Sequence, residues 1–206
     1  TMLFSAISFG CCIMYAVRFY KNLFTDEGYI TWTLPASPLT QLWAKILSAS
    51  IWYVLDLTIC FAAAWFLISG DNIQSALERI KPDFQAALGM SFSSFCGLVV
   101  FFSFVGILSC VLFIYTSIAI GQLVPAHRII VSIAVYFILN LITQIISIGV
   151  SIITSVFPDY VFSPAQTSFS EYFFQMLLIG TCATTVLAIA GYFITYRILQ
   201  RNVNLI

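Results

Sequence analysis

Charged residues are scarce along this chain. Lys, Arg, Asp and Glu make up 8% of its 206 residues, and their charges cancel to a formal net charge of zero. Ordinary soluble domains have about 25% charged residues, and a protein that binds nucleic acid carries a basic surface. The composition therefore excludes an ordinary soluble domain and indicates no nucleic-acid partner.

The residues and motifs of common catalytic and metal sites are also missing. His127 is the only histidine, and the six cysteines lie inside apolar runs without Cys-x-x-Cys spacing, so we expect no metal site and no disulfide framework. The chain has no Gly-x-x-x-x-Gly-Lys-Ser/Thr loop, no Gly-x-Ser-x-Gly elbow and no His-Glu-x-x-His motif. We therefore predict no catalytic residue, no enzyme activity and no cofactor bound to this chain.

Apolar sequence is what the chain has in excess. Apolar residues make up 61% of it and the mean hydropathy is +1.03, and a membrane-spanning helix needs about 20 predominantly apolar residues. Five such runs occur: Thr1–Val17, Ile46–Ser69, Met90–Gly121, Ile129–Phe157 and Tyr172–Tyr196. The sequence therefore predicts an all-α, polytopic membrane protein in which residues 1–206 form a single transmembrane domain in the lipid bilayer.

Basic residues orient this domain. Six of the eight lie in or beside the 18–45 loop, after the third run and after the fifth run, and cytoplasmic loops carry the excess of Lys and Arg. We therefore expect 18–45 and the C-terminus to be cytoplasmic, and 70–89 and 158–171 to be external. The first run is short, so we expect one more span before Thr1 and six spans in the full subunit.

The external segment 70–89 has the pattern of an amphipathic helix. Its apolar residues recur every three or four positions from Ile73 to Leu88. Asp71 or Asn72 is available to cap the helix, and Pro82 is expected to break or kink it. Two interpretations stay open: a helix that shapes the outer mouth of a pathway, or a connector on the membrane surface.

Three intramembrane features are candidates for function. Asp56 lies near the middle of the second run, where an ionised carboxylate needs a partner, water or a proton; it either serves a pathway or holds helices together. A polar stripe in the fourth run indicates a cavity, a subunit interface or bonding between helices. The stripe consists of Asn140, Thr143, Gln144, Ser147, Ser151 and Thr154. Gly180, Thr184 and Ala188 form a small-xxx-small ridge for close packing of helices.

The loop between the first two runs carries a family resemblance. It reads Arg18-Phe-Tyr-Lys-Asn-Leu-Phe-Thr-Asp-Glu-Gly-Tyr-Ile-Thr-Trp-Thr-Leu-Pro, followed by Leu39-Thr-Gln-Leu-Trp-Ala-Lys-Ile-Leu-Ser-Ala. This segment, and the C-terminal Arg197-Ile-Leu-Gln-Arg-Asn-Val-Asn-Leu, resemble permease subunits of bacterial ABC transporters of the type V exporter kind. The cytoplasmic loop of those permeases contacts a soluble ATPase subunit.

The resemblance implies a set of functional residues and partners. It implies a multi-pass protein of the bacterial plasma membrane that pairs with a second permease subunit and with an ATPase subunit, which binds ATP and Mg²⁺. The residues implied in ATPase coupling are Asp26, Glu27, Gly28, Tyr29, Leu34, Pro35 and Lys45, and we add Trp32 as an aromatic anchor. We expect Asp26–Leu39 to form a short helix. Re-entrant pieces, common in the family, would have to come from the ends of the last two runs.

Three functions remain open from the sequence. The first is the permease of an ATP-driven exporter that moves an amphiphilic or peptide-like substrate by alternating access. The second is a sensor or immunity subunit that binds a membrane-active peptide or a lipid-linked molecule. The third is a secondary transporter or channel, in which Asp56 and the polar stripe would form the ion path.

The predicted topology is testable by cysteine-accessibility labelling in a cysteine-free background. We expect cysteines introduced at Asp26 and Arg201 to be labelled from the cytoplasmic side, and cysteines at Asp83 and Pro164 from the outside, because of the bias in basic residues. Labelling of position 83 from the cytoplasmic side alone would contradict the topology.

Overall fold

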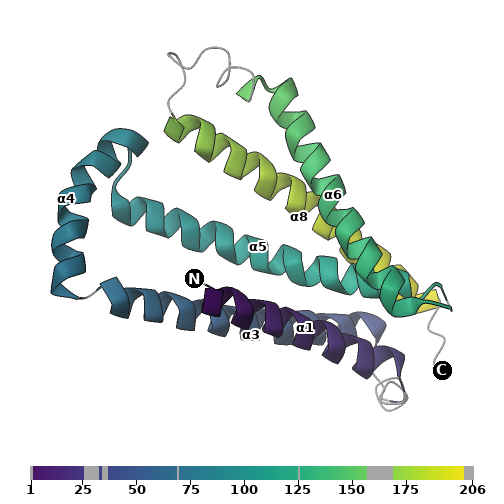
Figure 1. Ribbon diagram of the computed structural model, residues 1–206. Helices are drawn as coiled ribbons and strands as arrows, with labels where there is room; N and C mark the ends of the chain where they lie inside the picture. Colours follow the sequence, from purple (N-terminus) through teal and green to yellow (C-terminus); the bar gives the residue numbers. More distant parts are fainter. Residues whose placement is uncertain are drawn as a thin grey trace. The chain divides into compact units, whose positions relative to one another are not determined.

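The described part of the chain is helical. The computed structural model describes residues 2–25, 33, 37–68, 70–124, 126–156 and 169–201, and its regular secondary structure within these ranges is α-helix (Figure 1). The helices are α1 (Met2–Phe24), α3 (Pro38–Ile68), α4 (Asp71–Leu88), α5 (Phe92–Gly121), α6 (Arg128–Ile153) and α8 (Phe169–Arg201). The predicted all-α class is confirmed.

Four of these helices are long and apolar enough to cross a membrane. The spanning segments are Pro38–Ala63, Phe92–Gly121, Arg128–Ile153 and Glu171–Gln200, each of 26 to 30 residues. A helix of that length reaches about 39–45 Å, against about 30 Å of hydrocarbon. α1 covers the remaining predicted run and continues to Phe24, so the predicted start of the loop at Arg18 is wrong. The side chains of its first turns are outside the described part, and a fifth span stays a prediction.

Serine caps determine where two of the spanning helices begin. The Ser37 hydroxyl accepts a hydrogen bond from the Thr40 N–H, and the Ser91 hydroxyl accepts one from the Ser94 N–H, both at 3.2 Å. Pro38 occupies the first helical position, where its missing N–H and restricted φ are favourable. α3 therefore begins at Pro38, eight residues before the apolar run beginning at Ile46 that was predicted.

The predicted amphipathic helix is present as α4, with one correction, which concerns its N-cap. Gly70 occupies the N-cap position without a side-chain cap bond, so the prediction of capping by Asp71 or Asn72 is wrong. The helix does not break at Pro82 but continues to Leu88, along a curved course (Figure 1). It ends at Gly89, whose φ of 64° favours glycine and whose N–H bonds to the Gln85 carbonyl.

The chain divides into two compact units. The first comprises Thr1–Leu57, Ile107–Leu141 and Val186–Ile206, and the second comprises Thr58–Gly106 and Ile142–Thr185. The first unit contains the larger described core, which is built from α1, the start of α3, the end of α5 and the end of α8. Its buried members are Tyr15, Phe19, Leu23, Phe24, Leu42, Ile46, Ala49, Tyr53, Val111, Ile114, Tyr115, Ile118 and Leu199.

Aromatic contacts join three helices of the first unit. Phe19 of α1 stacks on Tyr115 of α5, with 3.8 Å between ring centroids and an interplanar angle of 11°. Tyr15 of α1 packs against Tyr53 of α3 at 4.7 Å. The Tyr115 hydroxyl also donates a hydrogen bond to the Lys45 carbonyl of α3 at 3.1 Å. These contacts tie α1, α3 and α5 together where the 18–45 loop leaves and re-enters the helices.

A polar junction joins α5 to α8 in the same unit. The hydroxyl of the buried Thr195 lies 3.2 Å from the hydroxyl of the buried Thr116. Gly191, one turn before Thr195, lies so close to Thr116 that a Cβ at position 191 would be 2.5 Å from the Thr116 Oγ1. The absence of a side chain at Gly191 therefore allows the close approach of the two helices.

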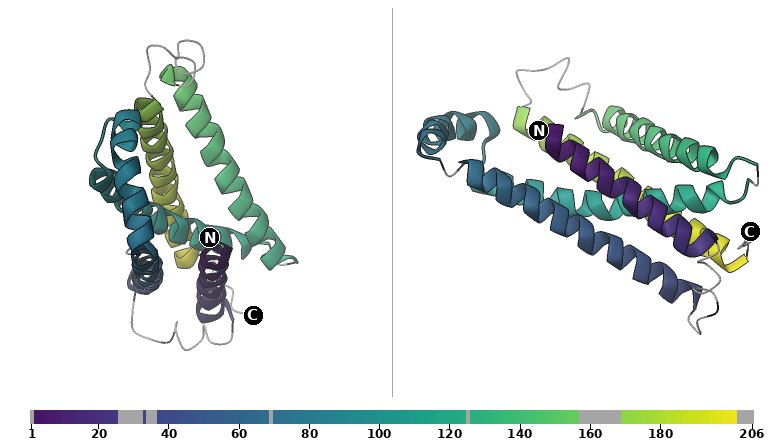
Figure 2. Two further views of the ribbon diagram at one scale, coloured as in Figure 1. Left: turned by 60° about the vertical axis from the view of Figure 1, so that its left-hand side comes forward. Right: turned by 60° about the horizontal axis from the view of Figure 1, so that its bottom comes forward.

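The second unit places α4 across the direction of its neighbours. Figures 1 and 2 show α4 running transverse to α5, which it precedes, and to the end of α3. Phe84 of α4 packs edge-on against Phe92 and Phe95 of α5, and Phe95 in turn packs against Phe173 of α8. A transverse amphipathic helix beside candidate membrane spans fits both interpretations of this segment, a connector on the membrane surface and a helix at the outer mouth of a pathway.

The junction at Gly191 predicts a size limit. We expect Gly191→Ala to destabilise the protein by about 1–3 kcal/mol, because the added methyl group overlaps Thr116. Gly106→Ala on α5 is the control: a Cβ there meets no atom within 4 Å, and alanine favours helix over glycine. Thermal unfolding in detergent measures both, and equal melting temperatures for the two variants would contradict the close approach.

Candidate functional site

A polar network at mid-helix in the first unit brings together groups from four helices. It begins with a hydrogen bond between the Cys12 thiol of α1 and the Tyr53 hydroxyl of α3. Cys110 of α5 lies near the side chains of Cys12, Tyr53 and Tyr136 and interacts with them. Tyr136 lies on α6, so the network links α1, α3, α5 and α6.

Asp56 and Asn140, which were predicted from the sequence as candidates for function inside the membrane, lie next to this network. The Asn140 amide on α6 donates a hydrogen bond to the Tyr136 carbonyl at 2.8 Å, and the two side chains also interact. Asp56, one turn after Tyr53 on α3, is half-buried and lies close enough to Cys12 to interact with it electrostatically. Asp56 and Asn140 come from different apolar runs, yet the tertiary structure places both on one polar track.

Local sequence explains how each helix presents these groups. Tyr53 and Asp56 are three residues apart on α3, and Tyr136 and Asn140 are four apart on α6, so each pair shares a helical face. Tyr53 is 7% exposed, whereas Asn140 is exposed. The track therefore runs from the buried interior to the surface of the first unit. Hydroxyl, thiol, amide and carboxyl groups in such a track suit hydrogen bonding to a polar group of a substrate, or joining of helices.

The side chains of the predicted polar stripe on α6 differ in how far they are exposed. Thr143 and Ser151 are buried, Ser147 is half-buried, and Asn140, Gln144 and Thr154 are exposed. Several of the hydroxyls bond to the helix's own backbone, as Ser151 does to the Ile148 carbonyl at 2.8 Å. Serine and threonine can satisfy themselves in this way inside an apolar helix, but the Asn140 and Gln144 amides present polar atoms at the helix surface.

The small-residue ridge of α8 has different surroundings at its three positions. A Cβ at Gly180 would lie 3.9 Å from the Ser147 Oγ of α6, an ordinary contact. The Thr184 hydroxyl bonds back to the Gly180 carbonyl, and Ala188 is buried. Of the two glycines of α8, Gly191 and not Gly180 is the one at which a Cβ would overlap another helix.

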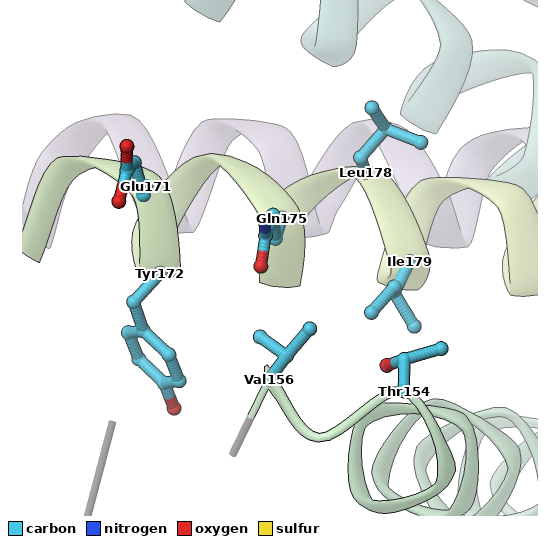
Figure 3. Close-up of a pocket in the computed structure, with 7 residues that line it drawn as sticks. All are labelled: Thr154, Val156, Glu171, Tyr172, Gln175, Leu178 and Ile179. Carbon is cyan, nitrogen blue, oxygen red and sulfur yellow. The ribbon is translucent and has the colours of Figure 1, made fainter. Parts of the chain in front are cut away.

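A pocket lies in the second unit between the end of α6 and the start of α8. Its volume is about 420 Å³. Figure 3 shows Tyr172 and Ile179 on the side of α8 toward Val156 and Thr154, while Glu171 and Leu178 point the other way. The lining residues are Thr154, Val156, Glu171, Tyr172, Gln175, Leu178 and Ile179. A mixture of apolar walls with a few polar groups suits an amphiphilic ligand.

The described ends of the last two runs, from which any re-entrant piece would have to come, are continuous with the helices next to this pocket. α6 is continuous through Ser147 and ends at Ile153, where Ser155 adopts a positive φ of 60°. α8 is continuous from Phe169 through Gly180. Residues 157–168 lie outside the described part.

The predicted coupling residues lie outside the described part of the chain. Asp26, Glu27, Gly28, Tyr29, Trp32, Leu34 and Pro35 all fall within residues 26–36, of which Thr33 alone is described. The coupling helix therefore stays a prediction. Lys45 is described: it lies half-buried in α3. Together with Arg18 of α1 it lines a second cavity, which is in the first unit.

Sequence reasoning missed the cysteines and tyrosines of the network. It treated Cys12 and Cys110 as small packing residues because they lack metal-ligand spacing. The available signal was the placement of tyrosine one turn from a polar residue, as in Tyr53 with Asp56 and Tyr136 with Asn140.

Comparison with protein-family models, curated protein sequences and solved structures found no match.

The network makes the Tyr53 hydroxyl important for stability. We expect Tyr53→Phe to lower the free energy of unfolding by about 0.5–1.5 kcal/mol, because the half-buried Cys12 thiol loses its hydrogen-bond partner. Tyr192→Phe is the matched control, since within the described residues the Tyr192 hydroxyl makes no hydrogen bond while its ring packs against Trp43. Similar melting temperatures for both variants in detergent would show that the network contributes nothing.

Proposed function

We propose that this chain is a membrane-spanning permease subunit of an ATP-driven ABC exporter of the type V exporter kind. Its substrate would be amphiphilic or peptide-like, and a separate ATPase subunit would bind ATP and Mg²⁺ and power alternating access. The four spanning helices and the resemblance of the segment beginning at Arg18 support this proposal. The chain would act as a transport subunit and not as an enzyme, because its sequence has no phosphate-binding loop.

The observation that carries the proposal is the way the 18–45 segment joins the helices. Its two ends belong to α1 and α3, which are held to α5 by the Phe19–Tyr115 stack and the Tyr115–Lys45 hydrogen bond. A force applied to the loop by a partner would therefore act on three packed helices and not on a loose connector. Rigid packing of this kind transmits small displacements between sites.

The arrangement of basic residues supports a cytoplasmic position for this loop and for the C-terminus in a bacterial plasma membrane. Lys21 lies in the last turn of α1, Arg128 begins α6, and Arg197 lies near the end of α8; all three belong to the first unit. Arg79 and Lys81 lie on α4 in the second unit. A cytoplasmic end of the first unit agrees with the positive-inside rule.

Two polar regions are the proposed contacts of the substrate. The pocket lined by Glu171, Tyr172 and Gln175 lies in the second unit, which holds the segments proposed to be external. The polar network with Asp56 lies in the first unit. An amphiphile moved across the bilayer needs apolar walls together with hydrogen-bonding groups that receive its polar part.

Exposed amides on α6 support pairing with a second permease subunit. Asn140 and Gln144, one turn apart, are both exposed in the isolated chain. Only 11% of the most apolar part of this span is buried within the chain. The Asn140 amide already donates to the Tyr136 carbonyl, but the Gln144 amide would cost several kcal/mol if it faced hydrocarbon without a partner. A second subunit would therefore stabilise the helix by covering this face.

The coupling function of the loop is testable with the purified permease and its ATPase. We expect Tyr29→Ala and Trp32→Ala each to cost about 2 kcal/mol or more of partner affinity, because buried aromatic anchors dominate binding energy. About 1.4 kcal/mol already weakens binding tenfold. The double variant should insert normally, lose the co-purifying ATPase and fail to stimulate ATP hydrolysis.

Phe66→Ala is the matched control for this experiment. Phe66 is an aromatic residue near the other end of α3, and 83% of its surface is exposed. Its loss should leave ATPase association unchanged. Unchanged association and turnover in the Tyr29→Ala/Trp32→Ala variant would show that the loop is a passive connector.

A further inference from the structure

A cavity with two cations lies in the first unit and shares no lining residue with the polar network. Its volume is about 370 Å³. The lining residues are Tyr15, Arg18, Phe19, Asn22, Lys45, Ser48, Ala49, Trp52 and Tyr115. The described lining thus has two positive charges and no acidic side chain.

The floor of this cavity is rigid and its rim is polar. Phe19, Ala49 and Tyr115 are each at most 3% exposed, and the stack of Phe19 on Tyr115 holds them in place. The Tyr115 hydroxyl bonds to the backbone of Lys45, so the wall that carries this cation is fastened to α5. The backbone that carries Lys45 is therefore held in place by packing and by a hydrogen bond, unlike the backbone beneath a chance grouping of lysines on a surface.

Side chains on the rim can bind an oxyanion. Arg18 offers a planar guanidinium that can donate two parallel hydrogen bonds to a phosphate, and Lys45 offers a compact ammonium. Asn22 and Ser48 add neutral hydrogen-bonding groups beside the cations. This combination of charge and donors matches a phosphate group better than it matches an apolar ligand.

The position of the cations along the helices indicates that the phosphate belongs to a lipid. Arg18 lies six residues before the end of α1 at Phe24, and Lys45 lies seven residues after the start of α3 at Pro38. At about 1.5 Å per residue, both lie about 10 Å from their helix ends. Headgroups occupy about 5–8 Å on each side of the hydrocarbon core, so both side chains can reach the headgroup layer from its inner boundary.

The helix surface beyond the rim suits acyl chains. Further along α3 from Lys45, Ile51 and Leu55 are exposed, and along α1 away from its end, Met14 is exposed. Trp52, half of which is exposed at the rim, is the type of residue that occurs at the boundary of headgroups and hydrocarbon. A soluble phosphate would use the cations but would leave these apolar faces without a role.

We infer that the cavity lined by Arg18 and Lys45 binds the headgroup of an anionic phospholipid, with its acyl chains along the exposed faces of α1 and α3. Basic pockets between membrane-spanning helices bind anionic headgroups in this way. The bound lipid would bridge α1 and α3 next to the 18–45 loop. This site does not depend on the proposed transport function, because it needs no ATPase partner.

Native mass spectrometry of the purified chain with added phosphatidylglycerol or phosphatidylcholine tests the site. The wild type should retain phosphatidylglycerol in preference to phosphatidylcholine. Arg18→Gln/Lys45→Gln should lower the apparent affinity for phosphatidylglycerol by about tenfold or more, since each cation near a headgroup contributes substantially. Its affinity for phosphatidylcholine should change little.

Two further variants separate the site from general charge and from misfolding. Lys21→Gln/Arg197→Gln removes the same charge from exposed positions on α1 and α8 that do not line the cavity, and it should leave lipid binding unchanged. Arg18→Lys/Lys45→Arg keeps both charges and should retain the preference for phosphatidylglycerol. That result would show that the loss of binding in the Arg18→Gln/Lys45→Gln variant is caused by the loss of charge.

Several outcomes would overturn the inference. One is equal retention of the two lipids by the wild type, and another is an equal loss of binding in both glutamine double variants. Displacement of phosphatidylglycerol by millimolar inorganic phosphate would assign the cavity to a free phosphate instead. None of these results bears on ATPase coupling, which is tested separately at Tyr29 and Trp32.

Discussion

Lack of water in the bilayer is the constraint on which this structure depends. Each backbone N–H and C=O at that depth must bond within the chain, and an unsatisfied group costs several kcal/mol. The spanning segments meet the constraint as unbroken helices, and several of the described serines and threonines inside them meet it by bonding to their own helix, as Thr116 and Ser151 do. The polar groups that remain must find partners on other helices, and the network around Tyr53 is where several of them meet.

Packing, and not exclusion of water, holds these helices together, because lipid is as apolar as the side chains that it contacts. The described structure concentrates close contacts in the first unit, where aromatic rings stack and Gly191 permits α8 to approach Thr116. The same unit contains the ends of the 18–45 loop and the cationic cavity. A partner or a lipid that binds at this end would therefore act on helices that are packed together.

Elements with a strong local signal were predictable from the sequence. Runs of apolar residues predicted the four described spans, and a period of three to four residues predicted α4. Boundaries were less predictable, because capping decides them: α3 begins at Pro38 through the Ser37 cap, well before its most apolar part. α4 continues through Pro82, since a helix can bend at proline and keep its remaining hydrogen bonds.

By itself the sequence determined the membrane class, the helical content and the bias of basic residues, because each follows from composition or from spacing along one segment. Only the tertiary structure decided which side chains meet. α5 is apolar on every face, so its sequence does not indicate that residues Val111–Ala119 lie almost entirely inside the first unit. Nor does periodicity show that Cys12 meets Tyr53 or that Arg18 and Lys45 line one cavity. The rotation of each helix follows from van der Waals contacts with its neighbours, and those contacts join residues far apart in the chain.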